Sequence, residues 1–269
     1  MTIRTIVTHV EPGTDQEVQQ RAGPSLALAR LFSAHLTALA FTTEVVGANA
    51  SPPNDDPAII ERQTAAAISR EAARLGVDCE VRGRSSFAYG IGDALVDQIM
   101  VSDMASMTTR VQQTVAQRML LTSAVFDSGR PLLLLPAGTT FRDSPLRVVV
   151  AWDATPAAVR AVHALLAFIP TGSEVTIATV THDKTIRSGQ SGIELTHLIA
   201  RHGHKATFAP VQQQGLGVLE ALLLKARELE ADMLVMGCVR HSPLRNFIFG
   251  SATTRLFEGK TALPILVSA

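Results

Sequence analysis

The sequence has few cysteines, few aromatic residues and no excess of charge of either sign. Cys79 and Cys238 are the two cysteines in 269 residues, too few and too far apart for a disulfide framework or a cysteine-rich zinc site. The 24 lysines and arginines balance the 24 aspartates and glutamates, and the aromatic residues are 10 Phe, 1 Trp and 1 Tyr. Proteins dedicated to nucleic-acid binding draw their affinity from an excess of basic residues, so this composition speaks against that class.

Long apolar runs are missing as well. The run from Arg130 to Pro136 is far shorter than the roughly 18 residues that a membrane span needs. The first residues lack the basic stretch, apolar stretch and small-residue site of a cleavable signal. Hydrophobic residues nevertheless make up 46% of the chain, which favours a packed core over disorder. We therefore expect a folded cytoplasmic protein that needs no membrane partner.

The second half of the chain alternates apolar runs with helical patterns. Leu146–Trp152 is rich in valine and typical of a parallel strand covered on both faces. Pro156 then suits the first turn of a helix, with Thr155 as its N-cap. Further strands are expected at 174–180, 205–210, 232–236 and 263–267, and further helices at 193–202, 218–230 and 251–258. This alternation predicts a parallel sheet with right-handed crossovers.

The first half repeats the same order of elements. Strands are expected at 4–10, 36–42, 77–82, 104–108 and 131–135, and helices at 26–33, 58–75 and 92–100. The strand Pro131–Leu135 ends its half as Pro264–Val267 ends the other. We predict an α/β protein of two tandem flavodoxin-like or Rossmann-like units, each a five-stranded, mainly parallel sheet with flanking helices, over residues 1–138 and 145–269.

Candidate binding residues gather in the second unit. Ligands of open parallel sheets bind beyond the carboxyl ends of the strands, near the point where the strand order reverses. Asp153 ends the first strand, Val180 the second, and Gly237 follows the fourth. Gly250 and Ser251 open the last predicted helix, whose unpaired N–H groups and dipole favour an anion. Glycines at such places are also common for structural reasons, so both interpretations stay open.

The second unit resembles the universal stress protein family. The resemblance is carried by Ala231–Gly237 (ADMLVMG), Arg240–Ala252 (RHSPLRNFIFGSA) and Leu263–Val267 (LPILV). Nucleotide-binding members of that family carry Gly-x2-Gly-x9-Gly-Ser/Thr between the fourth strand and the last helix. Gly237, Gly250 and Ser251 match this motif, whereas Arg240 stands where the middle glycine belongs.

The resemblance implies a site for ATP or another adenine nucleotide, with Mg²⁺, or an empty site that has decayed. Asp153 would hold the ribose or the adenine, and the backbone of Val180 the adenine edge. The phosphates would lie along the loop and the last helix, at Gly237, Arg240, Gly250, Ser251 and Ala252. Arg240 would either contact a phosphate or block it.

The first unit lacks this motif. Its counterpart segment, residues 108–115, contains no glycine, and its first strand ends His9-Val10-Glu11 without the aspartate. At most one nucleotide site is therefore expected, in the second unit. Family members pair through the strand that ends each domain, so the resemblance also implies an internal pseudo-dimer joined between Leu132–Leu135 and Ile265–Val267, with a homodimer as a further option.

Three functions stay open. The leading one is a stress-response protein that binds an adenine nucleotide and signals through an unidentified protein partner. The second is a nucleotide-free interaction scaffold. The third is an ATP-hydrolysing enzyme, which the sequence favours least because no acid–base pair or metal-binding carboxylate cluster accompanies the loop.

Other candidate sites have simpler explanations. His197, His202 and His204 cluster at a predicted helix end, where basic residues suit the helix dipole, without carboxylates or cysteines at ligand spacing. A hydrolase triad of Ser251 with His241 and Asp153 lacks a nucleophile elbow. We therefore assign no catalytic or metal-binding residue. Cys238 is either a reactive thiol or a small, half-buried side chain.

Overall fold

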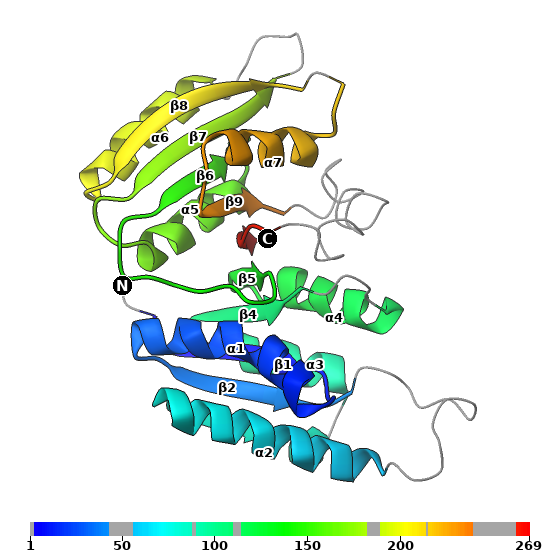
Figure 1. Ribbon diagram of the computed structural model, residues 1–269. Coiled ribbons are helices and arrows are strands. Elements are labelled where there is room, and N and C mark those ends of the chain that lie inside the picture. The colour runs from blue at the N-terminus through cyan, green and yellow to red at the C-terminus, as the bar shows by residue number, and fades with distance from the viewer. Residues whose placement is uncertain are drawn as a thin grey trace. The chain divides into compact units, whose positions relative to one another are not determined.

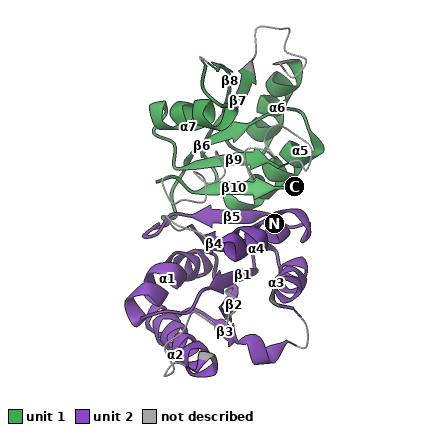
Figure 2. Cartoon of the chain, turned by 90° about the vertical axis from the view of Figure 1, so that its right-hand side faces the viewer, with its two compact units in different colours: residues 1, 142–269 green, residues 2–141 purple. Residues whose placement is uncertain are grey.

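The structure, a computed structural model, describes residues 3–42, 56–87, 90–109, 114–181, 189–213, 215–238 and 262–269. The chain divides into two compact units, residues 2–141 and residues 142–269, coloured purple and green in Figure 2. We call them the N-terminal unit and the C-terminal unit. Among the described residues, no helix is long and apolar enough to cross a membrane.

The described strands of the N-terminal unit form a parallel sheet in the order β3-β2-β1-β4-β5, with all five labelled in Figure 2 and all but β3 labelled in Figure 1. These strands are β1 (Thr5–Val10), β2 (His35–Ala40), β3 (Cys79–Arg82), β4 (Met104–Thr108) and β5 (Leu132–Leu135). The helices are α1 (Asp15–Phe32), α2 (Pro57–Leu75), α3 (Ile91–Met100) and α4 (Val115–Phe126), with a short 3-10 helix at Arg84–Ser86. Helix α1 packs beside α2 and α3 beside α4, which in a doubly wound sheet places one pair on each face.

The C-terminal unit has the same topology, with the parallel order β8-β7-β6-β9-β10. Its strands are β6 (Arg147–Ala151), β7 (Glu174–Thr181), β8 (Lys205–Gln212), β9 (Met233–Gly237) and β10 (Ile265–Ser268). Its described helices are α5 (Pro156–Phe168), α6 (Gly189–Arg201) and α7 (Val218–Glu228). The predicted α/β architecture of parallel sheets with flanking helices is confirmed, while the helix predicted at 251–258 lies outside the described residues.

Strands with continuous buried runs contribute to the cores of the two units. All four residues of β5 and all five of β9 are buried, as expected for strands covered by helices on both faces. A chain of buried hydroxyls crosses the N-terminal core, from Thr8 on β1 to Ser25 on α1 (3.0 Å) and on to Ser106 on β4 (2.9 Å). Each of these buried oxygens therefore has a hydrogen-bond partner, which offsets the cost of removing it from water.

An aspartate just before the fourth strand holds the start of the first strand in both units. Asp103 Oδ2 accepts from the backbone N–H groups of Arg4 (2.8 Å) and Thr5 (2.9 Å). Asp232 Oδ2 accepts from the backbone N–H of Arg147 (2.8 Å) in the same way. The two contacts align the units residue by residue, with Thr5 equivalent to Arg147 and Asp103 to Asp232.

Helix α1 is longer than the sequence predicts. The prediction began it near Leu26, because Gly23 and Pro24 look like a break in the helical pattern. The observed helix begins at Asp15, where Thr14 and Glu17 form a capping box, and it continues through Pro24. Proline removes only one intrahelical hydrogen bond, and the buried side chains on both sides of Pro24 keep the helix against the sheet. Smaller differences are an earlier start of α6 and a later end of β8.

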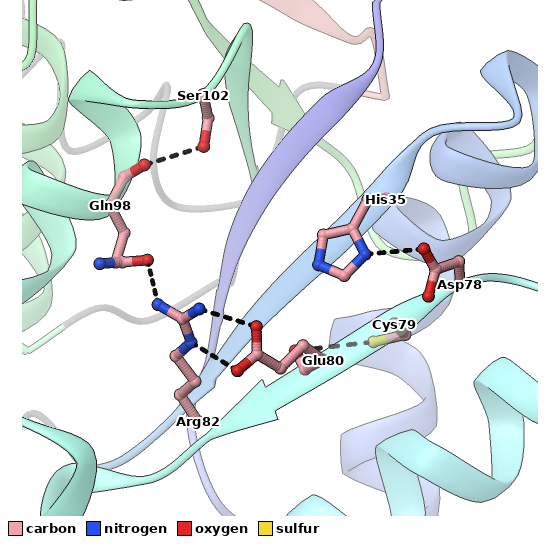
Figure 3. A network of polar contacts seen from close by, with 7 residues as sticks. All are labelled: His35, Asp78, Cys79, Glu80, Arg82, Gln98 and Ser102. Atoms are coloured by element: carbon pink, nitrogen blue, oxygen red, sulfur yellow. Dashed lines mark hydrogen bonds and ion pairs between the residues drawn. The ribbon is translucent and has the colours of Figure 1, made fainter.

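Charged side chains line β3, an edge strand of the N-terminal sheet (Figure 3). Arg82 donates to both carboxylate oxygens of Glu80, through Nε at 2.9 Å and Nη2 at 2.7 Å. His35 Nδ1 lies 2.9 Å from Asp78 Oδ2. Paired charges of this kind discourage another strand from adding to the edge. Between them, burial and then the neighbouring acidic charges raise the pKa of the Cys79 thiol to about 11.

The edge strand β8 of the C-terminal sheet is protected by a proline. The N–H of Lys205 donates to Ser173 O (2.9 Å) on the β7 side. Pro210 is five positions further along β8, so by the two-residue alternation of a strand its missing N–H would face the free edge. A proline at this position leaves a gap in the row of donors that an added strand would need.

Replacing Asp103 tests the clamp on the first strand. We expect Asp103→Ala to lower the free energy of unfolding by about 1–3 kcal/mol, because two backbone donors lose their acceptor. Although burial raises it, hydrogen bonds from Arg4 and Thr5 bring the pKa of Asp103 below 3.8. A lowered carboxyl pKa stabilises the fold at pH values above 3.8, and this contribution is lost in stronger acid. Denaturant unfolding at pH 7 and near pH 3 should therefore show the difference shrinking in acid.

The exposed Asp97 on α3 provides the matched control for this experiment. Asp97→Ala should leave the free energy of unfolding nearly unchanged at both pH values. Equal effects of the two substitutions would contradict the proposed clamp.

Candidate functional site

The crevice expected for a ligand lies between β6 and β9, where the strand order of the C-terminal unit reverses. β6 and β9 are paired up to Ala151 and Met236, so Trp152–Asp153 and Gly237–Cys238 emerge side by side at the carboxyl ends of the two strands. The last residues of β7 lie beside them, since Ala151 is also paired with Ala178. The fold thus brings together three predicted site residues, Asp153, Val180 and Gly237.

Asp153 is held in place by the start of α5. Its Oδ1 accepts from the backbone N–H (3.1 Å) and the hydroxyl (2.7 Å) of Thr155. Thr155 Oγ1 in turn accepts from the backbone N–H of Ala158 and caps the helix. Ala154 between them has a φ of 60°, a left-handed conformation that is uncommon for alanine. The Asp153 carboxylate is exposed, and within the described part of the chain its Oδ2 has no hydrogen-bond partner.

The backbone of Val180 faces the space beyond the end of β6. Trp152 N–H donates to Ala178 O (2.8 Å), so the polar groups of Ala178 face β6. Val180 is two positions further along β7 and its N–H and C=O face the same side, past the last residue of β6. Thr179 Oγ1 donates to Trp152 O (2.9 Å), and the Trp152 indole donates to Ser191 on α6 (3.0 Å). These bonds fix the strand ends around Val180.

Gly237 is a glycine because α5 leaves no room for a side chain. A Cβ placed on it would lie 2.3 Å from the backbone N of Ala158 and 2.6 Å from the carbonyl carbon of Ala157. Both neighbours are backbone atoms in the first turn of α5, which do not move aside as a flexible side chain can. The sequence predicts that Gly237 binds phosphate. The structure shows a second reason for a glycine here, since any side chain would clash with the backbone of α5.

Cys238 is buried and lies near Asp153. Its backbone N–H donates to Ser268 O (2.7 Å), which ties the strand end to β10. Burial and then the negative charge of Asp153 raise the pKa of the Cys238 thiol to about 12. The thiol is therefore neutral at physiological pH, and the side chain packs as a small apolar group rather than acting as a reactive thiol.

The remaining predicted site residues, Arg240, Gly250, Ser251 and Ala252, lie outside the described residues, as does His241. Among the histidines, His197 Nδ1 lies 3.6 Å from Glu194, and His204 is buried at the start of β8. Within the described ranges, no three His, Cys, Asp or Glu side chains are grouped so that they could hold a metal ion.

Sequence reasoning missed a counterpart of Asp153 in the N-terminal unit. With Thr5 equivalent to Arg147, Glu11 falls at the position of Asp153 and Thr108 at that of Gly237. Glu11 lines a small pocket at the carboxyl ends of β1 and β4, together with His9, Arg21, Met107, Thr108 and Gln117. The first residue of α1 lies four positions after Glu11, whereas the first residue of α5 lies three positions after Asp153, which hides this equivalence in the sequence.

No protein-family model matches the sequence, and no curated protein matches it either. Solved structures do share its fold. A universal stress protein from Archaeoglobus fulgidus DSM 4304 superposes with a TM-score of 0.69 at 17% identity, over 97% of this chain and 95% of that one. A protein described as a universal stress protein from Pseudomonas aeruginosa UCBPP-PA14 gives 0.51 at 14% identity, over 99% and 93%. The chain therefore has the tandem fold of the universal stress proteins.

The same fold occurs in a protein of another kind. The cytoplasmic domain of a prokaryotic cation chloride cotransporter superposes with a TM-score of 0.51 at 11% identity, over 100% of this chain and 96% of that one. The fold alone consequently does not assign a ligand or an activity, which have to be argued from the site.

The packing of Gly237 can be tested by adding one methyl group. We expect Gly237→Ala to lower the free energy of unfolding by about 2–3 kcal/mol, because the methyl group meets the backbone of α5. Gly92→Ala on α3 is the control, since its Cβ would meet nothing within 4 Å. Denaturant unfolding measures both variants, and a harmless Gly237→Ala would show that α5 does not limit this position.

The state of Cys238 can be tested with a thiol reagent. At pH 8 a thiol of pKa about 12 is ionised to about one part in 10⁴, so the folded protein should react far more slowly than the unfolded chain. A Cys79→Ser background isolates Cys238, and the labelling rate with and without denaturant is the measurement. Rapid labelling of the folded protein would restore the reactive-thiol interpretation.

Proposed function

We propose that the protein works as a universal stress protein whose C-terminal unit binds an adenine nucleotide at the crevice between β6 and β9. The observation that carries the proposal is the position of the Asp153 carboxylate. One oxygen is held by Thr155 and the other is left for a donor from outside the described chain. A ribose offers such donors in its hydroxyl groups, and hydrogen bonds to a carboxylate are among the stronger ones.

Val180 supports the proposal from the neighbouring strand. Its backbone offers one donor and one acceptor toward the space past β6. The edge of adenine carries an acceptor ring nitrogen beside a donor amino group, so it complements this pair. Along the N7 edge, guanine has a carbonyl oxygen at the position of the amino group and would place two acceptors against one donor. The proposed ligand class is thus adenine nucleotides rather than nucleotides in general.

The phosphates would extend toward Arg240, Gly250 and Ser251. The formal charge of the chain is zero, so affinity for phosphate would come from these local groups rather than from a basic surface. Mg²⁺ would arrive with the phosphates, keeping part of its own water shell. Signalling would then consist of partner contacts that depend on the bound nucleotide.

The second candidate is a nucleotide-free interaction scaffold. Two observations favour it, namely Arg240 at the place of the motif glycine and the occurrence of this fold in the cotransporter domain. The two candidates differ in one measurable property, the presence of a bound nucleotide.

Nucleotide binding is tested on the full-length protein. Denaturation followed by chromatography should release an adenine nucleotide, and ATP with Mg²⁺ at 100 times its Kd should add about 2.7 kcal/mol of stability. Asp153→Ala should weaken binding by about 10- to 100-fold, because a charge-assisted hydrogen bond is lost. GTP under the same conditions should give a smaller thermal shift.

Asp143→Ala is the matched control, since Asp143 is an exposed aspartate of the same unit away from the strand ends. It should leave the ATP affinity unchanged. If the wild type releases no nucleotide and shows no thermal shift with ATP, the scaffold is the correct interpretation. Steady release of phosphate from ATP would instead support an enzyme.

A further inference from the structure

The point where the strand order reverses is built differently in the N-terminal unit. Thr108 at the end of β4 takes the place of Gly237 and carries a side chain that the C-terminal unit has no room for. Its hydroxyl donates to the carbonyl of Arg21 on α1 at 2.6 Å. Arg21 is the seventh residue of α1, whereas Gly237 meets Ala157 and Ala158, the second and third residues of α5.

This difference of about four residues corresponds to one helical turn. Helix α1 therefore extends one turn further beyond the strand ends than α5 does. Glu11, the counterpart of Asp153, is half-buried, whereas Asp153 is exposed. The extra turn begins at the capping box of Thr14 and Glu17, which fixes the connection from β1.

The side chain of Arg21 lies between the first turn of α1 and the β1–α1 connection, where it lines the small pocket at the carboxyl ends of β1 and β4. Arg21 is 8% exposed, and its Nη1 donates to the carbonyl oxygens of Glu11 (2.7 Å) and Pro12 (2.6 Å). Its Nη2 donates to Glu17 Oε1 (2.7 Å). The connection wraps closely around the guanidinium, because a Cβ on Gly13 would lie 2.6 Å from Arg21 Nη1.

The other polar groups at these strand ends also bond within the unit. Glu11 Oε1 accepts from the Thr42 hydroxyl at 3.0 Å, and His9 Nε2 lies 2.9 Å from Phe41 O. The carboxylate that corresponds to Asp153 is thus engaged by the chain itself. The positive charge of Arg21 is paired with Glu17, and the acidic Glu11 lines the same pocket.

We propose that the Arg21 guanidinium is the built-in occupant of the N-terminal crevice and closes it to nucleotides. The N-terminal unit keeps the topology of a binding domain, but its own side chain takes the place of a ligand. The statement that a nucleotide binds only to the C-terminal unit rests on the proposed function. The statement that Arg21 occupies the N-terminal crevice does not depend on it. A cavity left by this side chain should have the shape and hydrogen-bonding pattern of a guanidinium ion.

Chemical rescue tests this prediction. Arg21→Ala should lower the midpoint of thermal unfolding by about 5 °C or more relative to the wild type. Millimolar methylguanidinium should restore about half of that loss in the variant, through binding to the folded form alone, and should not stabilise the wild type. Methylammonium has the same charge without the fork of donors and should restore nothing. Hydrogen exchange of α1 locates the effect in the N-terminal unit.

Arg30→Ala provides the control, because Arg30 is an exposed arginine in the last turn of the same helix. It should shift the midpoint little and show no rescue. Arg21→Met keeps the apolar stem and should show the same rescue if Arg21→Ala does not fold. Equal midpoints for the Arg21 and Arg30 variants, or rescue by methylammonium as well, would overturn the proposal.

Calorimetry with ATP separates this proposal from the function proposed above. We expect one ATP-binding site per chain in the wild type and no binding after Asp153→Ala. A site that survives Asp153→Ala and disappears on filling the N-terminal crevice would overturn the closure by Arg21. An absence of ATP binding would contradict the proposed function, and the methylguanidinium experiment alone would then decide the role of Arg21.

Discussion

The contact between the end of the fourth strand and the first crossover helix sets the form of each crevice. In the C-terminal unit, Gly237 lets the first turn of α5 pack directly against the end of β9. Asp153, just before this turn, is exposed. In the N-terminal unit, the Thr108 hydroxyl donates a hydrogen bond to Arg21 O, which lies about one turn further along α1. The first turn of α1 therefore extends beyond the ends of the strands. The residue at the end of the fourth strand thus contacts the first crossover helix at a different turn in each unit.

This constraint explains how two units of one topology differ in chemistry. Both units clamp their first strand with an aspartate, and both carry an acidic residue where that strand ends. Within the described ranges, the hydrogen bonds of the Asp153 side chain come from Thr155 at the start of α5. Glu11 instead accepts from Thr42, and its backbone carbonyl accepts from the buried Arg21. Backbone packing therefore accounts for the sheet topology that the two units share. The capacity to bind a ligand depends instead on the side chains at the ends of the strands.

Much of the fold could be predicted from the sequence, because continuous apolar runs such as those of β5 and β9 have few structural options. The first turns of α1 could not, since Gly23 and Pro24 interrupt the pattern and only tertiary packing carries the helix through them. Asp153, Val180 and Gly237 were predicted to lie together from the strand order alone. The role of Arg21 was not predictable, because its partners Glu11 and Pro12 belong to a connection whose path depends on where α1 begins.

The likeness to other structures limits what the fold itself can explain. A stress protein and the cytoplasmic domain of a cotransporter share this architecture with the chain at low identity. A ligand therefore has to be argued from the side chains at the strand ends. These differ between the two units of this chain, with an exposed carboxylate in one and a buried guanidinium in the other. The same strand order thus supports two units whose polar groups at the strand ends have different partners.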